Sequence, residues 1–138
     1  MNNKLRTIKG ITHNLAHSEI YVNNNGDVYV KNPSKNPGMI LIWADWCGHC
    51  TRFKPTYVDI CTKLNGNGIV KYPCIAIEDE ELKKNPNVLQ KLNVQGYPTI
   101  KFFNQDGIII GDFTGKREVS VILKTICDVY HQCIQNAF

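Results

Sequence analysis

The sequence lacks any long apolar run. None of its 138 residues fall in a stretch approaching the ~20 apolar residues of a membrane-spanning helix. The first ten residues are polar, without the hydrophobic region of a signal peptide, and the last four form no retention tetrapeptide. We therefore expect no membrane partner, and a chain that stays in the cytoplasm where it is made.

Charge is also sparse and scattered. Charged residues make up 20% of the chain, with a formal net charge of +4 and no basic run interleaved with aromatics. This pattern favours a solvated surface over a nucleic-acid partner. Hydrophobic residues reach 43%, enough for one core in a chain of this length. We expect a monomer with a single domain over residues 1–138.

Six cysteines are present, but they do not form the framework of a small secreted protein. Only Cys47 and Cys50 lie together in a motif. The other four fall inside apolar patterns, where cysteine is expected to act as a small buried hydrophobe: Cys61, Cys74, Cys127 and Cys133.

Hydrophobic patterning predicts a mixed β-sheet with helices on its faces. Pro55 lies inside the first expected helix and should kink it. The expected elements are a hairpin at 19–30, strands at 39–43, 69–77, 99–103 and 108–113, and helices at 47–65, 86–92 and 119–134.

The run Trp46-Cys47-Gly48-His49-Cys50 carries the chemistry. It joins a buried strand to a helix, and the N–H groups at a helix start stabilise a thiolate there. This lowers the pKa of Cys47 from about 8.5 toward neutrality, so Cys47 is the predicted nucleophile. Cys50, one turn further, is the predicted resolving thiol, and His49 beside the thiolate should favour the reduced form and make the disulfide a stronger oxidant.

Two cysteines at this spacing also occur in zinc sites, which need two further ligands. No second such pair exists, and His13 and His17 would have to cross from the N-terminal segment. We therefore expect no metal, and no cofactor besides the redox-active cysteine pair. His13, His17 and His131 are expected to be ordinary surface residues.

These residues carry a family resemblance. The run Trp43 to Cys50, followed by Pro55, resembles thioredoxins, and Gly48-His49 resembles the catalytic domains of protein disulfide isomerases. The stretches 94–103 and 115–118 are similar to the cis-proline segment and the opening of the last helix of that family. The resemblance implies a thioredoxin-like three-layer α/β sandwich with its active site in residues 38–138. Residues 1–37 diverge, and the hairpin is expected to replace the opening strand and helix.

The resemblance also implies roles around the cysteine pair. Pro98 should be cis and packed against it, with the backbone at Gly96 and Tyr97 available to an extended substrate. Arg117 is similar in position to an isomerase arginine that approaches the resolving cysteine and lowers its pKa. The alternative for Arg117 is an ordinary surface arginine at a helix start.

Two positions depart from the family. The buried acid expected six residues before the first cysteine is Leu41, and the position of its lysine partner is Cys74. The acid and the lysine are expected to be lost together, since burying one of the two charges without the other is costly. Proton transfer from the resolving thiol then needs another acceptor, for which Asp45, water and Glu78 are candidates.

The sequence therefore predicts a thiol-disulfide oxidoreductase that oxidises or isomerises protein thiols and disulfides through Cys47 and Cys50. A reductant supplied by a reductase and a redox-inert peptide-binding module are the alternatives, and the intact cysteine pair argues against the module. An isomerase-type centre in the reducing cytoplasm needs its own thiol oxidase. Large cytoplasmic DNA viruses have such a pathway, and abundant Asn, Ile and Lys fit an AT-rich viral genome.

Overall fold

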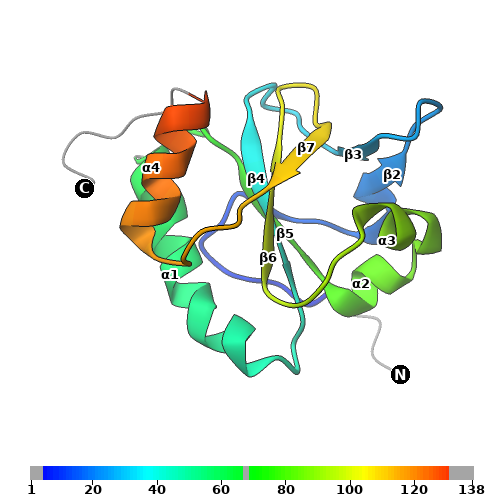
Figure 1. Ribbon diagram of the computed structural model, residues 1–138, viewed down its shortest axis with the longest axis horizontal. Helices are drawn as coiled ribbons and strands as arrows, with labels where there is room; N and C mark the ends of the chain where they lie inside the picture. Colours follow the sequence, from blue (N-terminus) through cyan, green and yellow to red (C-terminus); the bar gives the residue numbers. More distant parts are fainter. Residues whose placement is uncertain (1–4, 67–68, 131–138) are drawn as a thin grey trace.

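The computed structural model describes residues 5–66 and 69–130. Their main sheet is mixed and five-stranded, in the order β1-β5-β4-β6-β7. Helices α1 and α4 cover one face, while α2, α3 and the β2–β3 hairpin lie on the other side (Figure 1). The strands are β1 (His13–Asn14), β2 (Ile20–Val22), β3 (Val28–Val30), β4 (Gly38–Trp43), β5 (Cys74–Glu78), β6 (Thr99–Phe103) and β7 (Ile109–Asp112). The helices are α1 (Gly48–Asn65), α2 (Asp79–Lys83), α3 (Pro86–Leu92) and α4 (Val119–Tyr130), with a short 3-10 turn at His17–Glu19.

β4 is the central strand that the apolar run predicts. It pairs in parallel with β5 and antiparallel with β6, and all six of its residues are buried. Leu41 and Trp43 pack in the core beneath α1, whereas Ile40 and Ile42 pack toward α3. An unbroken apolar run is the expected sequence of a strand covered on both faces.

α1 follows the predicted pattern and ends at Gly66, whose φ is +60°. Its buried stripe lies against the sheet, and the Tyr57 hydroxyl donates to the Ile75 carbonyl at 2.7 Å. This bond fixes the middle of the helix to β5. Pro55 lies inside α1, and the kink expected there stays a prediction.

The N-terminal segment confirms one expectation and corrects another. The predicted hairpin is present, with β2 and β3 antiparallel. The opening strand was not expected, yet β1 pairs in parallel with β5, placing His13 opposite Ile75 and Asn14 opposite Ala76. Two residues are too few to produce a periodic pattern, so hydrophobicity alone does not reveal β1.

The region after α1 differs from the prediction at two points. β5 begins at Cys74, so residues 69–73 of the expected strand lie outside the observed one. It is followed at once by the unpredicted helix α2, whose first turn is acidic and whose cap, Glu78, accepts from the Glu80 N–H at 2.8 Å. Acidic residues in a first turn are stabilised by the helix dipole, so 78–81 carried the missed signal.

The cysteines outside the motif divide into two groups. Cys61 and Cys74 are buried free thiols, as expected. Cys127 corrects the expectation, because it is half-buried and engaged in a disulfide. It follows the buried Ile126, and the next residue along a helix turns about 100° away from the buried stripe. Cys133 lies outside the described residues, as do His131 and the end of the last expected helix.

Candidate active site

The cysteine pair lies where β4 ends and α1 begins. Cys47 is the cap residue of α1, and its N–H donates to the Ala44 carbonyl at 3.1 Å. Gly48, the exposed first residue of the helix, follows it. Cys47 is 7% exposed and Cys50 only 1%. Cys47 is thus the more accessible residue of the pair, in line with its predicted role as the nucleophile.

The helix start acts on Cys47 as the sequence suggests. Burial alone would raise the pKa of this thiol, but donors outweigh it and lower the pKa. They include the Cys50 N–H, 3.4 Å from the Cys47 sulfur, and the His49 N–H, with a contribution from the Arg117 charge. These groups favour the thiolate over the thiol.

Cys50 is affected in the opposite direction. Burial, followed by the neighbouring Cys47, raises its pKa to about 11, although the Ala44 backbone and the Lys54 charge act against the rise. Cys50 therefore keeps its proton under conditions in which Cys47 can ionise. The two thiols, one helical turn apart, are chemically distinct.

The His49 side chain has a partner that the sequence did not indicate. Its ring is exposed, and Nδ1 lies 2.9 Å from the Arg52 guanidinium, so the group seen to act on Cys47 is the His49 backbone N–H. A tuning role for the ring stays a prediction.

The segment before β6 forms the wall opposite Cys47. The Tyr97–Pro98 peptide bond is cis, as expected, and the Tyr97 carbonyl oxygen lies 3.7 Å from the Cys47 sulfur. Gly96 is exposed with open space around it. Trp46, 69% exposed, meets the edge of the Tyr97 ring at 5.7 Å between centroids. The sulfur therefore lies beside an aromatic surface and a stretch of accessible backbone.

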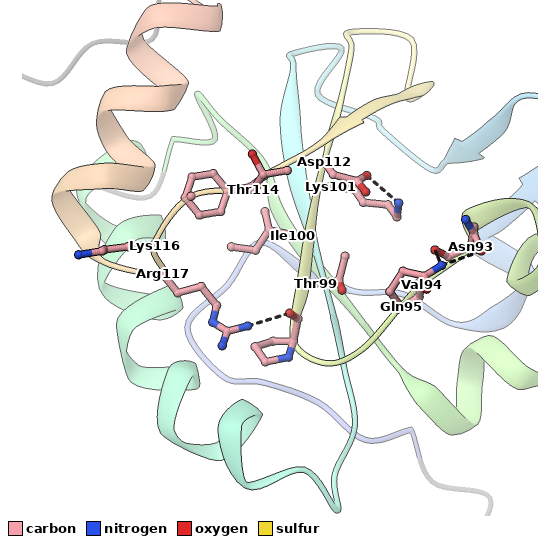
Figure 2. A pocket seen from close by; sticks show the side chains of 13 residues that line it. Asn93, Val94, Gln95, Thr99, Ile100, Lys101, Asp112, Thr114, Lys116 and Arg117 are labelled. Carbon is pink, nitrogen blue, oxygen red and sulfur yellow. Dashed lines mark hydrogen bonds and ion pairs between the residues drawn. The ribbon is translucent and has the colours of Figure 1, made fainter.

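Arg117 belongs to the same region. It extends toward the start of β6 beside a cavity of about 440 Å³ (Figure 2), and its guanidinium donates to the Pro98 carbonyl at 3.2 Å. In this position its charge lowers the pKa of Cys47. The implied effect on Cys50 stays a prediction.

The family's buried charge pair is absent, as the sequence indicates. Leu41 and Cys74 are both fully buried in the core beneath α1. Of the proposed substitutes, Glu78 accepts from the Asp45 N–H at 3.0 Å and lies 3.4 Å from the Arg6 guanidinium. It therefore fixes the loop before the cysteines from beneath, and its role as a proton acceptor stays a prediction.

Two charged residues near the site were missed by sequence reasoning. Lys54 places its ammonium 3.8 Å from the centroid of the buried Trp43 ring, and its charge acts on Cys50. Its spacing of four residues from Cys50 on one helix was the available signal. Asp79, buried at the start of α2, accepts a short hydrogen bond from the Tyr97 hydroxyl.

Metal-binding groups do not gather here. Within residues 5–66 and 69–130, no three His, Cys, Asp or Glu side chains form a group suited to a metal ion. His13 and His17 are exposed and lie 2.9 Å from Glu19 and Glu81. In the same part of the chain, no helix is long and apolar enough to span a bilayer.

Comparison with known proteins identifies the class to which this fold and site belong. The thioredoxin family model matches residues 18–128, so the chain belongs to the thioredoxin family. Its curated relatives include protein disulfide-isomerase A3 of Gallus gallus, 38% identical over 93 residues, covering 65% of this chain and 17% of that protein. Protein disulfide-isomerase A4 of Mus musculus is 29% identical over 110 residues, covering 80% and 16%. The chain thus spans less than a fifth of these relatives.

Solved structures show the same fold at low identity. Full-length ERdj5 has a TM-score of 0.62 and 17% identity, over 88% of this chain and 16% of that one. Thioredoxin f from spinach chloroplast has a TM-score of 0.58 and 18% identity, over 90% and 97%. These likenesses establish the thioredoxin fold with its mixed sheet.

Proposed function

We propose that this protein is a thiol-disulfide oxidoreductase of the oxidase and isomerase type, acting on protein substrates. One observation carries the proposal: across a single turn of α1, the pKa of Cys47 is lowered and that of Cys50 is raised. The nucleophile, Cys47, must be ionised to attack, while the resolving residue, Cys50, stays protonated until the mixed disulfide has formed. The likeness to protein disulfide-isomerases supports the same conclusion.

In the reductive direction, the Cys47 thiolate attacks one sulfur of a substrate disulfide, that bond breaks, and one substrate thiolate leaves. Cys50 then loses its proton and attacks the Cys47 sulfur. The mixed disulfide breaks, the second substrate thiolate leaves, and Cys47 and Cys50 end as a disulfide. The reverse sequence oxidises a substrate dithiol. If a substrate thiolate attacks the mixed disulfide first, the substrate disulfide is rearranged and Cys47 is regenerated.

Stabilisation of the Cys47 thiolate supports the oxidising direction. Groups that stabilise the reduced form raise the reduction potential of the couple. The N–H donors and Arg117 act in this way on Cys47. A thiol oxidase would then reoxidise Cys47 and Cys50 to the disulfide. A protein that works as a reductant would instead depend on a reductase.

The reduction potential of the Cys47/Cys50 couple, measured against glutathione, tests the direction. We expect a reduction potential of about −180 mV, as for protein disulfide isomerase. A potential of about −270 mV, as for thioredoxin, would favour the reductant. Refolding of scrambled ribonuclease and reduction of insulin test the activity, with Cys47→Ser as the inactive control and Cys50→Ser expected to accumulate mixed disulfide. If the wild type is inactive in both assays, the redox-inert peptide-binding module is the better reading.

A further inference from the structure

Two side chains contact the carboxylate of Asp79, which is 1% exposed. The Tyr97 hydroxyl donates to Oδ1, and the Lys83 ammonium lies 2.9 Å from Oδ2. The Trp46 side chain also acts to lower the pKa of Asp79, and its ring meets the edge of the Tyr97 ring at 5.7 Å between centroids. Asp79 therefore links α2 with the residues that flank the Cys47 sulfur.

The charge states strengthen the central contact. Burial would raise the pKa of Asp79, but hydrogen bonds from Tyr97 and Lys83 outweigh it and lower that pKa. Burial, followed by the bond to Asp79, raises the pKa of Tyr97 well above its usual value. Tyr97 thus donates to an ionised carboxylate, which is the stronger kind of hydrogen bond.

The same tyrosine reaches the reaction centre through its backbone. Its carbonyl oxygen lies 3.7 Å from the Cys47 sulfur, and its ring meets the edge of Trp46. Tyr97 is thus fixed at its hydroxyl end by Asp79 and faces the sulfur at its backbone end. Trp46 directly precedes Cys47 and packs on the Tyr97 ring, so the bond between Asp79 and Tyr97 fixes one wall beside the sulfur directly and the other through that ring contact.

We propose that Asp79 is a positioning residue for protein substrates, holding Tyr97 and Trp46 so that an extended substrate segment can lie beside Cys47. The inference rests on the proposed function and deepens it. An extended segment needs both walls in place, whereas a small disulfide needs only access to the sulfur. Loss of Asp79 should therefore weaken the use of protein substrates and leave the reactivity of Cys47 nearly unchanged.

The test compares Asp79→Ala and Tyr97→Phe, which remove the same hydrogen bond from opposite ends. We expect each to raise KM for insulin reduction by about five- to thirtyfold, with kcat within about twofold. Attack of the reduced enzyme on hydroxyethyl disulfide should change by less than about twofold, because the groups acting on the thiolate remain. Asp79→Asn, which keeps an acceptor oxygen, should recover most of the loss. Glu80→Gln, on the same helix with its side chain in solvent, is the matched control and should behave like the wild type.

A double variant separates positioning from general damage. Because the two residues act through one contact, Asp79→Ala combined with Tyr97→Phe should be no worse than Asp79→Ala alone, within about twofold. Losses that multiply, an unchanged KM in both single variants, or an equal loss with hydroxyethyl disulfide would each refute the proposal. If Asp79→Ala fails to fold, Tyr97→Phe decides, since it leaves the carboxylate paired with Lys83. Failure of the wild type in all assays would instead refute the proposed function.

Discussion

Lys54 offers a quantitative test of how the rise in the pKa of Cys50 is limited in a chain that lacks the buried acid and lysine of its family. Its ammonium is held over the ring of Trp43, and its charge lowers the pKa of Cys50 against the large effect of burial. Replacing Lys54 by Met keeps the length of the side chain and removes the charge. The pKa of Cys50, already about 11, should then rise further.

The size of the effect follows from Coulomb's law. Two charges one helical turn apart, at an effective dielectric constant between those of water and of the protein surface, interact by about 1 kcal/mol, or somewhat less than one pKa unit. A resolving thiol with a pKa one unit higher is ionised about tenfold less often. Its thiolate is about threefold more nucleophilic, so resolution should slow by about two- to threefold.

The pKa of Cys50 can be measured from the pH dependence of its alkylation in a Cys47→Ser background. Lys54→Met should shift that profile upward by about half to one unit, and Lys54→Arg should leave it within about 0.3 unit. Lys63→Met, at the other end of α1, is the matched control. An alkylation profile identical in Lys54→Met and Lys63→Met would show that the Lys54 charge does not act on Cys50. Lys54→Met should also unfold a few degrees earlier, since a cation over an aromatic ring contributes about 0.5–2 kcal/mol.

Three further predictions concern stability. Leu41→Asp should lower the free energy of unfolding by about 3–5 kcal/mol in urea titrations, and adding Cys74→Lys on the same sheet face should recover part of the loss; full stability of Leu41→Asp alone would contradict this. Tyr57→Phe should cost about 1–2 kcal/mol by removing the bond from the Tyr57 hydroxyl to the Ile75 carbonyl, and an unchanged unfolding midpoint would argue against that bond. Burial opposes ionisation of Glu81, yet hydrogen bonds from His17 and Lys84 lower its pKa from 4.5 to about 2, so its contribution is present above pH 4.5 and is lost as the pH falls toward about 2. Glu81→Gln should therefore destabilise the protein by about 1–3 kcal/mol at pH 7 and flatten the acid side of the stability profile, and a wild-type acid profile would refute this reading.

The central strand and the cysteine helix could be predicted because each carries a long, regular pattern. β4 is an unbroken apolar run, and α1 repeats its buried residues at helical spacing. The cysteine pair was identifiable because the chemistry requires these residue types at this spacing, and Pro98 because its segment resembles the cis-proline segment of the family. Short elements escaped prediction, since β1 has two residues and α2 has five.

The supporting contacts were harder to foresee because they join residues far apart in the chain. The sequence contains Asp79 and Tyr97, but only the fold brings their side chains together. The contact between the His49 ring and Arg52 was likewise not foreseen. Cys127 was misassigned because the hydrophobic pattern does not resolve the edge of the buried face of a helix. There, one residue along the chain separates a buried position from a half-buried one.

The N-terminal segment, the part least like the family, contributes a cation, Arg6, next to the loop that precedes the cysteine pair. Arg6 lies 3.4 Å from the carboxylate of Glu78 and 3.8 Å from that of Asp45, and Glu78 fixes the loop that leads into Trp46 and Cys47. A version of the protein shortened to its thioredoxin-like core would leave a buried carboxylate without its cation directly beneath the catalytic loop. The divergent segment therefore supplies the cation for a buried carboxylate that holds the loop before the cysteine pair.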